Sequence, residues 1–155
     1  MAAPDERPIV LITGATGNLG RSLANALAHD YRIVGLDLKA KGVDFPVFEA
    51  DFTSDASMEL AFHKFRDAFG SNIASVIHLV AYFDFTGEDK PLYQSVNVEG
   101  TRRLLRALQS FQVEQFVYSS TMLVHSPCAP ESASMSSSRS NRAGLILNRR
   151  PLPKR

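Results

Sequence analysis

Residues 13–20 read Thr13-Gly14-Ala15-Thr16-Gly17-Asn18-Leu19-Gly20, a TGxxGxxG pattern that follows a short apolar run. In such a pattern Gly14 permits a tight turn, Gly17 lets the backbone approach phosphate groups, and Gly20 allows the following helix to pack closely on the sheet. A glycine loop between a strand and a helix can hold a dinucleotide pyrophosphate on backbone N–H groups and a helix N-terminus. The segment therefore predicts a nucleotide-phosphate site. A Walker loop is excluded because no Gly-Lys-Ser/Thr follows.

The first 125 residues alternate between strand-like and helix-like patterns. Apolar runs predict strands over residues 8–13, 31–36, 46–50, 75–80 and 114–119. Helices are expected between them, with apolar stripes at Leu19, Leu23, Ala26 and Leu27, at Met58, Ala61, Phe62, Phe65 and Phe69, and at Leu92, Val96, Gly100, Leu104 and Leu108. Ser54 or Asp55 can cap the second helix and Gly70 closes it. This alternation indicates an α/β fold, a Rossmann-like, doubly wound parallel sheet that is truncated after about five strands.

Asp37 follows the second predicted strand and bears on the choice of cofactor. An acid at this place can accept hydrogen bonds from the adenosine ribose hydroxyls, and it would repel the extra phosphate of NADP. We therefore expect NAD rather than NADP, although the nearby Lys39 and Lys41 weaken the argument. The alternative interpretation is a solvent-facing turn acid.

The composition excludes several other classes of protein. The 155 residues are 45% hydrophobic and 21% charged, as in a soluble globular domain, and a net charge of +1 gives no sign of a nucleic-acid partner. No apolar run approaches the roughly 20 residues that span a bilayer, and no signal peptide opens the sequence. We expect a cytoplasmic location and no membrane contact. The lone Cys128 excludes an internal disulfide and gives no metal cluster.

Six segments in a fixed order carry a resemblance to a known family. They are the glycine loop, Asp37, Ala50-Asp51-Phe52, Val-Ile-His-Leu-Val-Ala at residues 76–81, Asn-Val-Glu-Gly-Thr at residues 97–101, and Phe-Val-Tyr-Ser-Ser-Thr at residues 116–121. With these segments the chain resembles the extended short-chain dehydrogenases/reductases, the NAD-dependent epimerase/dehydratase group. The resemblance implies hydride transfer at a hydroxyl or carbonyl of a small-molecule substrate, with NAD as cofactor. It also leaves room for a homodimer.

The resemblance implies a set of cofactor-binding residues. They are Gly14, Thr16, Gly17, Asn18, Leu19, Gly20, Asp37, Asp51, Phe52, Val80 and Ala81. Asp51 would meet the adenine ring with Phe52 beside it, the alternative for Asp51 being a helix-entry acid before Thr53 and Ser54. Val80 and Ala81 would line the cofactor at the end of the fourth strand. His78, in contrast, has the pattern of a core histidine.

The resemblance also implies catalytic positions, and it shows a gap. Thr121 matches the catalytic hydroxyl that binds the substrate oxygen, with Ser120 as the second choice and Asn97 as a residue that holds a helix kink and a water. Such a family uses a tyrosine with a lysine four positions later as its acid/base pair. None of the four tyrosines, Tyr31, Tyr82, Tyr93 and Tyr118, has such a lysine. We therefore expect little or no turnover from these 155 residues alone.

The last part of the chain, residues 126–155, differs from the first 125 residues. It is rich in serine and arginine and shows no apolar face, which is typical of a disordered basic tail. A second interpretation is a change of reading frame. One set of codons for residues 141–150, read in the alternate frame, gives Pro-Gly-Trp-Ala-Tyr-Pro-Lys-Ser-Lys, which contains the missing Tyr-x-x-x-Lys pattern. The nucleotide sequence of the gene around codon 126 tests this hypothesis.

Three functional hypotheses remain open from the sequence. The first is a truncated epimerase/dehydratase-type NAD enzyme, whose intact parent oxidises a substrate hydroxyl. The second is a non-catalytic NAD-binding or NAD-sensing module that uses residues 126–155 as an interaction segment. The third is an unstable product, because a sheet cut after five strands exposes its edge and the apolar wall meant for later helices.

Overall fold

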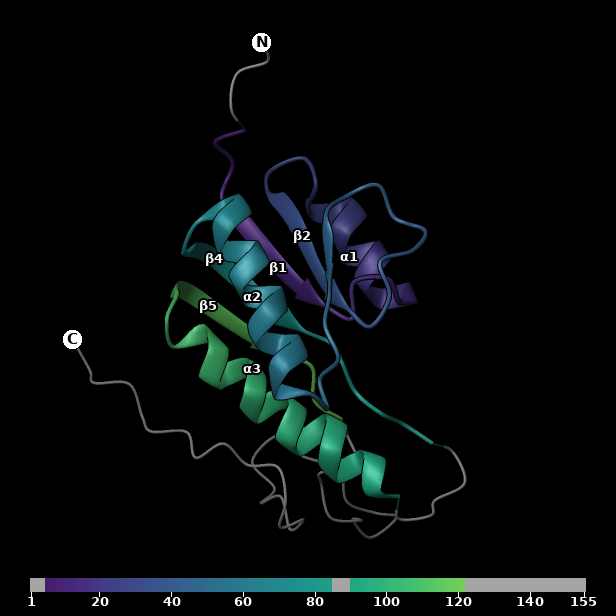
Figure 1. The fold of residues 1–155 in the computed structure, drawn as a ribbon. Helices are drawn as coiled ribbons and strands as arrows, with labels where there is room; N and C mark the ends of the chain where they lie inside the picture. The colour runs from purple at the N-terminus through teal and green to yellow at the C-terminus, as the bar shows by residue number, and fades with distance from the viewer. Residues whose placement is uncertain (1–4, 85–89, 122–155) are drawn as a thin grey trace, which may run out of the picture. The chain divides into compact units, whose positions relative to one another are not determined.

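The computed structural model of this protein describes residues 5–84 and 90–121. The elements are β1 (Ile9–Thr13), α1 (Asn18–Leu27), β2 (Arg32–Asp37), β3 (Val47–Glu49), α2 (Asp55–Phe69), β4 (Asn72–His78), the π-helix η1 (Tyr93–Gly100), α3 (Thr101–Leu108) and β5 (Gln112–Tyr118). The strands form one parallel sheet in the order β3-β2-β1-β4-β5 (Figure 1). The predicted Rossmann-like fold is confirmed.

The strand order places β1 between β2 and β4. The chain moves outward from β1 to β3 on one side and then crosses to β4 and β5 on the other. Both ladders of β1 end at Thr13, which pairs with Leu36 of β2 and with His78 of β4. In open parallel sheets, the crevice beyond the carboxyl ends of the strands at such a reversal is the usual ligand site. The glycine loop begins at this point of the sheet.

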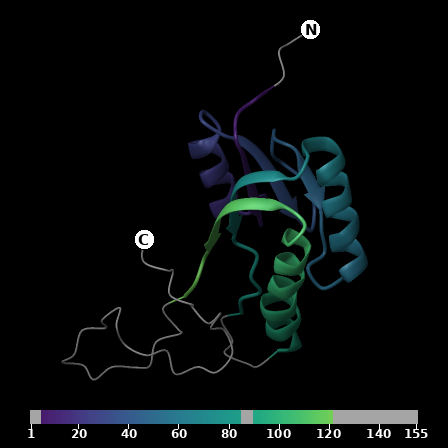
Figure 2. The ribbon, with the colours of Figure 1, turned by 90° about the vertical axis from the view of Figure 1, so that its left-hand side faces the viewer.

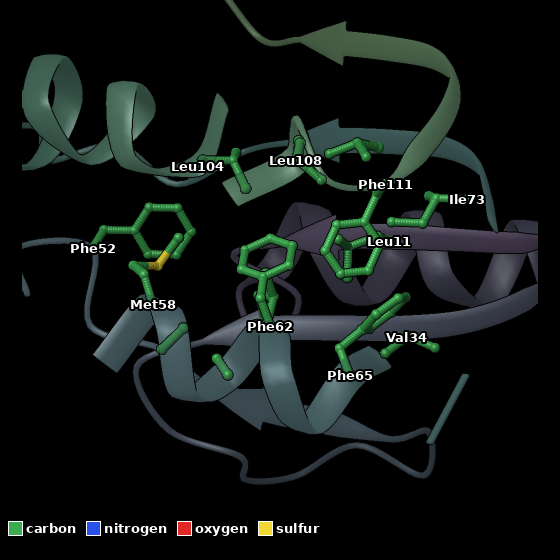
Figure 3. Packing of buried hydrophobic residues seen from close by; sticks show 14 residues of the cluster. Leu11, Val34, Phe52, Met58, Phe62, Phe65, Ile73, Leu104, Leu108 and Phe111 are labelled. Atoms are coloured by element: carbon green, nitrogen blue, oxygen red, sulfur yellow. The ribbon is translucent and has the colours of Figure 1, made fainter. Parts of the chain in front are cut away.

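Helices cover both faces of the sheet, and the two faces differ (Figure 2). Helices α2 and α3 pack on one face, where the larger hydrophobic cluster includes Leu11, Phe62, Phe65 and Leu104 (Figure 3). Helix α1 packs on the other face through Ala24, on a smaller cluster with Val10, Ile12 and Ile33. On this second face a groove of about 550 Å³ also runs over β4 and β5, with Ile77 and Val117 in its lining. The side chains of β1 thus alternate between a deep core and a shallow one.

Helix α1 buries only part of the predicted stripe, since Leu23 and Leu27 pack against the smaller cluster and the other two positions do not. The expected Leu19 is 55% exposed and Ala26 is also exposed, while Gly20 and Ala24 are buried. Leu23 is half-buried, as predicted. The reason is that the helix approaches the preceding loop closely, and only positions with little or no side chain fit between the two backbones.

The predicted stripe of the third helix is correct only in its second half. Gly100, Leu104 and Leu108 are buried, whereas Leu92, just before η1, is 44% exposed. A π-helix has more residues per turn than an α-helix, so an i+4 stripe rotates away from the core within it.

The caps of α2 are as expected. The Ser54 side chain accepts from the N–H of Ser57, and Gly70 ends the helix at φ 79°.

The predicted boundaries of two strands are corrected. β4 is Asn72–His78 instead of residues 75–80, and β5 is Gln112–Tyr118 instead of residues 114–119. The two strands pair from Asn72 with Gln112 onward, so polar residues open the ladder. The regular pairing of β1 with β4 ends at His78, which leaves residues 79–82 as a separate segment.

The chain divides into two units, Met1–Ser119 and Ser120–Arg155. All the strands and helices named above belong to the first unit. The tail predicted over residues 126–155 lies outside the described residues, as do residues 85–89. In the described ranges, no helix is long and apolar enough to cross a membrane.

Candidate functional site

The glycine loop, residues 13–20, turns sharply away from the sheet. Gly14 has φ 73°, a conformation that glycine adopts without strain, and its N–H donates to the carbonyl of Leu36 at 2.8 Å. The N–H of Gly17 donates to the carbonyl of Gly14 at 3.2 Å, and α1 begins at the next residue. The loop therefore stays attached to β2 at Gly14. Asn18 and Leu19 lie exposed at the start of α1.

The three glycines of the loop have different surroundings. A Cβ on Gly20 would lie 2.3 Å from the carbonyl oxygen of Gly14 and 2.7 Å from Cα of Ala15, so a side chain there is excluded. The expectation that Gly20 packs on the sheet is thus corrected, because it packs on the loop backbone. A Cβ on Gly17 would meet only the Gly14 oxygen, at an ordinary 3.4 Å. Space next to Gly17 is the cradle that a phosphate group would need.

Asp37 fastens the glycine loop to β2. One carboxylate oxygen, Oδ2, accepts hydrogen bonds from the N–H of Thr16 at 2.9 Å and from its hydroxyl at 2.8 Å. The other oxygen accepts from the N–H of Leu38 at 2.7 Å. Arg21 donates to the carbonyl of Thr16 at 2.7 Å on the other side of the loop. Asp37 is therefore a structural partner of the loop and not a simple solvent-facing acid.

The segment after β4, residues 79–82, lies against the glycine loop; we call it the β4 loop. A Cβ on Gly14 would lie 3.3 Å from the Val80 nitrogen and 3.4 Å from the carbonyl carbon of Leu79. The Thr13 hydroxyl accepts from the N–H groups of Leu79 at 3.2 Å and Val80 at 3.4 Å. Val80 is half-buried and Ala81 is exposed. Three predicted cofactor segments, the glycine loop, Asp37 and the β4 loop, thus meet at the carboxyl end of β1.

His78 is a core histidine, as predicted. Its side chain is 1% exposed, and its ring stacks on Phe52 with the centroids 5.8 Å apart. Nδ1 lies 2.6 Å from the Thr13 hydroxyl and Nε2 lies 2.9 Å from the Thr101 hydroxyl. Burial lowers the pKa of His78 from its ordinary 6.5 to about 4. The imidazole is therefore neutral near pH 7.

Asn97 lies in the π-helix and contacts the β4 loop. Its side-chain oxygen accepts from the N–H of Tyr82 at 2.6 Å, and its side-chain nitrogen donates to the Tyr82 carbonyl at 3.0 Å. The backbone carbonyl of Asn97 accepts from the Thr101 hydroxyl at 2.7 Å. The structure thus gives Asn97 a definite contact, with the backbone of the β4 loop. The catalytic role implied by the resemblance stays a prediction.

Asp51 and Phe52 have local partners. Oδ1 of Asp51 accepts from the N–H and the hydroxyl of Thr53, at 2.8 and 2.7 Å. The side-chain hydrogen bond from Thr53 is the main reason that the pKa of Asp51 is lowered. This is the geometry of the alternative, the helix-entry acid. The Phe52 side chain is buried in the large core, so Phe52 could reach a cofactor only through its backbone.

Ser120 and Thr121 follow β5 and are both exposed. They belong to the second unit of the chain, while the glycine loop, Asp37 and the β4 loop belong to the first. Their proposed role toward a substrate oxygen therefore rests on the sequence alone. In residues 5–84 and 90–121, no group of three or more His, Cys, Asp or Glu side chains could hold a metal ion.

Sequence reasoning missed three residues that shape this region. Thr13 and Thr101 bond to the two ring nitrogens of His78. Gly35 of β2 makes room for the loop, because a Cβ there would lie 2.7 Å from that of Ala15. The buried hydroxyls give no periodic signal. Gly35 had one, as a glycine inside an otherwise apolar strand marks a close approach of another segment.

The fold is of the Rossmann class, and the glycine loop lies at the end of the sheet where such folds hold their ligands. A sequence model described as "NAD dependent epimerase/dehydratase family" matches residues 10–142. The chain belongs to that family. The match continues past residue 125 into the segment interpreted above as a tail.

Known proteins are similar to parts of the chain. The sterol-4-alpha-carboxylate 3-dehydrogenase (decarboxylating) of Schizosaccharomyces pombe is 30% identical over 77 residues, which are 50% of this chain and 20% of that enzyme. An NAD-bound short-chain dehydrogenase/reductase superfamily protein of Agrobacterium tumefaciens is 30% identical with a TM-score of 0.62, covering 75% of this chain and 33% of that one. The Bordetella bronchiseptica enzyme WbmG in complex with NAD has 22% identity and a TM-score of 0.62, with coverage of 80% and 41%. The chain thus spans well under half of each relative.

Proposed function

We propose that this chain binds NAD at the carboxyl end of β1, as the cofactor-binding part of an epimerase/dehydratase-type oxidoreductase. The observation that carries the proposal is that the glycine loop, Asp37 and the β4 loop meet at the carboxyl end of β1, beside the open space at Gly17. The family description and the NAD-bound Agrobacterium protein support the choice of cofactor.

The described residues fit the parts of NAD in different ways. The N–H groups at the start of α1 and the open space at Gly17 suit the pyrophosphate. Asp37 suits the adenosine ribose, since a carboxylate can accept about four hydrogen bonds and three are used here. We assign Asp51 to the adenine through the Oδ2 atom that does not bond to Thr53, and Val80 and Ala81 to the rest of the cofactor. Bound NAD would supply a nicotinamide ring that accepts or returns a hydride.

The protein's own groups would orient a small-molecule substrate in the intact parent. Thr121, or Ser120 in second place, would donate a hydrogen bond to the substrate oxygen, where negative charge develops during the transfer. Asn97 would support the site through the β4 loop, which it holds at Tyr82. The acid/base pair is missing from the 155 residues, so the proposal assigns NAD binding to this chain and turnover to the parent.

A glycine substitution with a matched control tests the NAD site. Gly17→Ala has room for its methyl group and an extended backbone with φ −72°, so the fold should survive. The same methyl group would occupy the phosphate cradle, and we expect NAD affinity to fall by about 100-fold or more, the value of a lost close phosphate contact of about 3 kcal/mol. Isothermal titration of the 155-residue chain with NAD gives the affinity, and circular dichroism checks the fold.

A wild-type chain that binds no NAD would overturn the proposal. So would a Gly17→Ala variant that is folded and binds NAD as well as the wild type. Ser22→Ala, an exposed position one turn further along α1, is the matched control and should leave both the fold and the NAD affinity unchanged.

Asp37→Asn tests the preference for NAD. The substitution removes the charge that would repel the extra phosphate of NADP, while two cations remain: Lys39, two positions further on, and Arg21, which donates to the carbonyl of Thr16. We expect the ratio of NAD to NADP affinity to fall by about tenfold, as for one charge contact of about 1.4 kcal/mol. An unchanged ratio in parallel titrations would assign the preference to other residues.

A further inference from the structure

A continuous chain of buried hydrogen bonds joins the end of β1 to the π-helix. It runs from the Thr13 hydroxyl through the ring of His78 to the Thr101 hydroxyl, and from there to the backbone carbonyl of Asn97. Thr13, His78 and Thr101 are all buried. The residues at the two ends of this network, Thr13 and Asn97, also contact the β4 loop.

The direction of each hydrogen bond follows from the atoms involved. The Thr101 hydroxyl donates to the Asn97 carbonyl, so it can only accept from His78, and Nε2 must carry the ring proton. In the neutral ring Nδ1 is then an acceptor, so the Thr13 hydroxyl donates to it. This leaves the oxygen of Thr13 to accept from the N–H groups of Leu79 and Val80. Every polar group in the chain is satisfied in one arrangement only.

The β4 loop is held at both of its ends by this chain. Leu79 and Val80 are fixed by the Thr13 hydroxyl, and Tyr82 is fixed by both polar atoms of the Asn97 side chain. Ala81, between these attachments, is exposed. A four-residue segment attached at both ends has little freedom, so its exposed backbone keeps one position next to Gly14.

We propose that His78 is a positioning residue that, as its Nε2–H tautomer, couples the junction of η1 and α3 to the β4 loop and so sets the width of the NAD crevice. This inference rests on the proposed NAD site and deepens it. Its specific content is that Thr101, which lies in α3 outside the residues assigned to NAD contact, controls the placement of Val80. A core histidine that merely fills space would have no such effect.

Nuclear magnetic resonance of the 155-residue protein tests the direction of these hydrogen bonds without any ligand. The ¹⁵N shifts of the His78 ring should show Nε2 protonated and Nδ1 unprotonated at pH 7. Protonated Nδ1 would overturn the proposal. In Thr101→Val the amide of Val80 should exchange with solvent at least about tenfold faster than in the wild type, the effect of losing about 1.4 kcal/mol of protection.

Three variants separate positioning from general stability. Ile73→Ala opens a cavity in the same core at the other end of β4, and it should lower stability without a selective effect on Val80. Thr101→Ser and Thr13→Ser keep the hydroxyls, so in these variants the Val80 amide should exchange as slowly as in the wild type. If Thr101→Val changes the Val80 amide no more than Ile73→Ala does, after correction for global stability, the proposal is wrong.

Titration with NAD then tests the consequence for the crevice. Thr101→Val should weaken NAD binding about fivefold to tenfold, the value of one hydrogen bond, while Ile73→Ala should leave the affinity of the folded protein unchanged. Equal affinities for the two variants would reject the coupling. If the wild type binds no NAD, the proposed function fails, and the ring shifts and the Val80 exchange rate still decide the role of His78.

Discussion

The two loops that meet at the carboxyl end of β1 are held in place by opposite means. The glycine loop is positioned by the absence of side chains, since Gly20 touches loop backbone and Gly14 adopts φ 73°. The β4 loop is positioned by side chains, through Thr13 at one end and Asn97 at the other. The glycine loop needs glycine because its backbone lies in contact with other backbone. The β4 loop is instead held by hydrogen bonds from side chains. The following predictions test this difference, from the largest effect on stability to the smallest.

Gly20→Ala should have the largest effect. The new methyl group would lie 2.3 Å from the Gly14 oxygen, and both atoms are attached to backbone that cannot move aside cheaply. We expect a loss of about 3 kcal/mol or more in the free energy of unfolding, at the upper end of overpacking effects. Urea denaturation measures it. A loss below about 1 kcal/mol would show that α1 does not depend on this contact.

Acidification should act on the β4 loop through His78. The pKa of His78 is about 4 in the folded chain against an ordinary 6.5, so the unfolded chain takes up this proton first as the pH falls. The folded state should therefore have full stability above pH 6.5 and lose about 3 kcal/mol by pH 4, with the steepest contribution from His78 between those values.

The control for this pH dependence is His78→Gln, which has no titrating ring at that position. Its stability should depend much less on pH between 5 and 6.5, a window that lies above the ordinary pKa range of the carboxylates. The groups that contact the His78 ring are the hydroxyls of Thr13 and Thr101 and the rings of Phe52, Phe116 and Tyr118. Equal pH slopes in the two proteins would contradict the buried neutral state.

Asn97→Asp should have an intermediate effect. The carboxylate can still accept from the N–H of Tyr82, but the donor to the Tyr82 carbonyl is lost. We expect a loss of about 1–2 kcal/mol in urea denaturation, as for one half-buried hydrogen bond with an acceptor left unpaired. Asn25→Asp, which makes the same change at an exposed position of α1, should cost less.

Thr16→Val should have the smallest effect of the four. It removes the hydroxyl bond to Asp37 and keeps the bond from the backbone N–H. The expected loss is about 1 kcal/mol, and Thr16→Ser should recover most of it. A larger loss would mean that the side chain of Thr16, and not glycine, determines the shape of the loop.

The same contrast explains how much of the molecule the sequence could predict. The spacing of Gly14, Gly17 and Gly20 predicts the glycine loop, and alternating strands and helices indicated the parallel sheet. No sequence pattern predicts the hydrogen bonds that hold the β4 loop. Thr13 and Thr101 are ordinary hydroxyls 88 positions apart in the numbering of the chain, and only the fold brings them to the two nitrogens of one ring.

The errors in the predicted elements have related causes. The i+4 stripe ran unbroken through Leu92 because a π-helix has no separate signature in the sequence. Leu19 was assigned to the buried stripe of α1 because it is apolar, yet small residues take that face. Asp51 and Phe52 were linked to the adenine as a pair, a role that stays a prediction, and the pattern gave no sign that Asp51 bonds to Thr53 or that Phe52 lies in the core. In α1 a tertiary contact outweighed the local pattern.

The most direct measurement is a map of NAD binding by amide chemical shifts of the 155-residue chain. The account predicts that NAD perturbs the amides of Gly14, Gly17, Leu38, Val80 and Ala81, the segments around the carboxyl end of β1. Shifts confined to the groove lined by Ile77 and Val117, or no shifts at all with millimolar NAD, would contradict the proposed site.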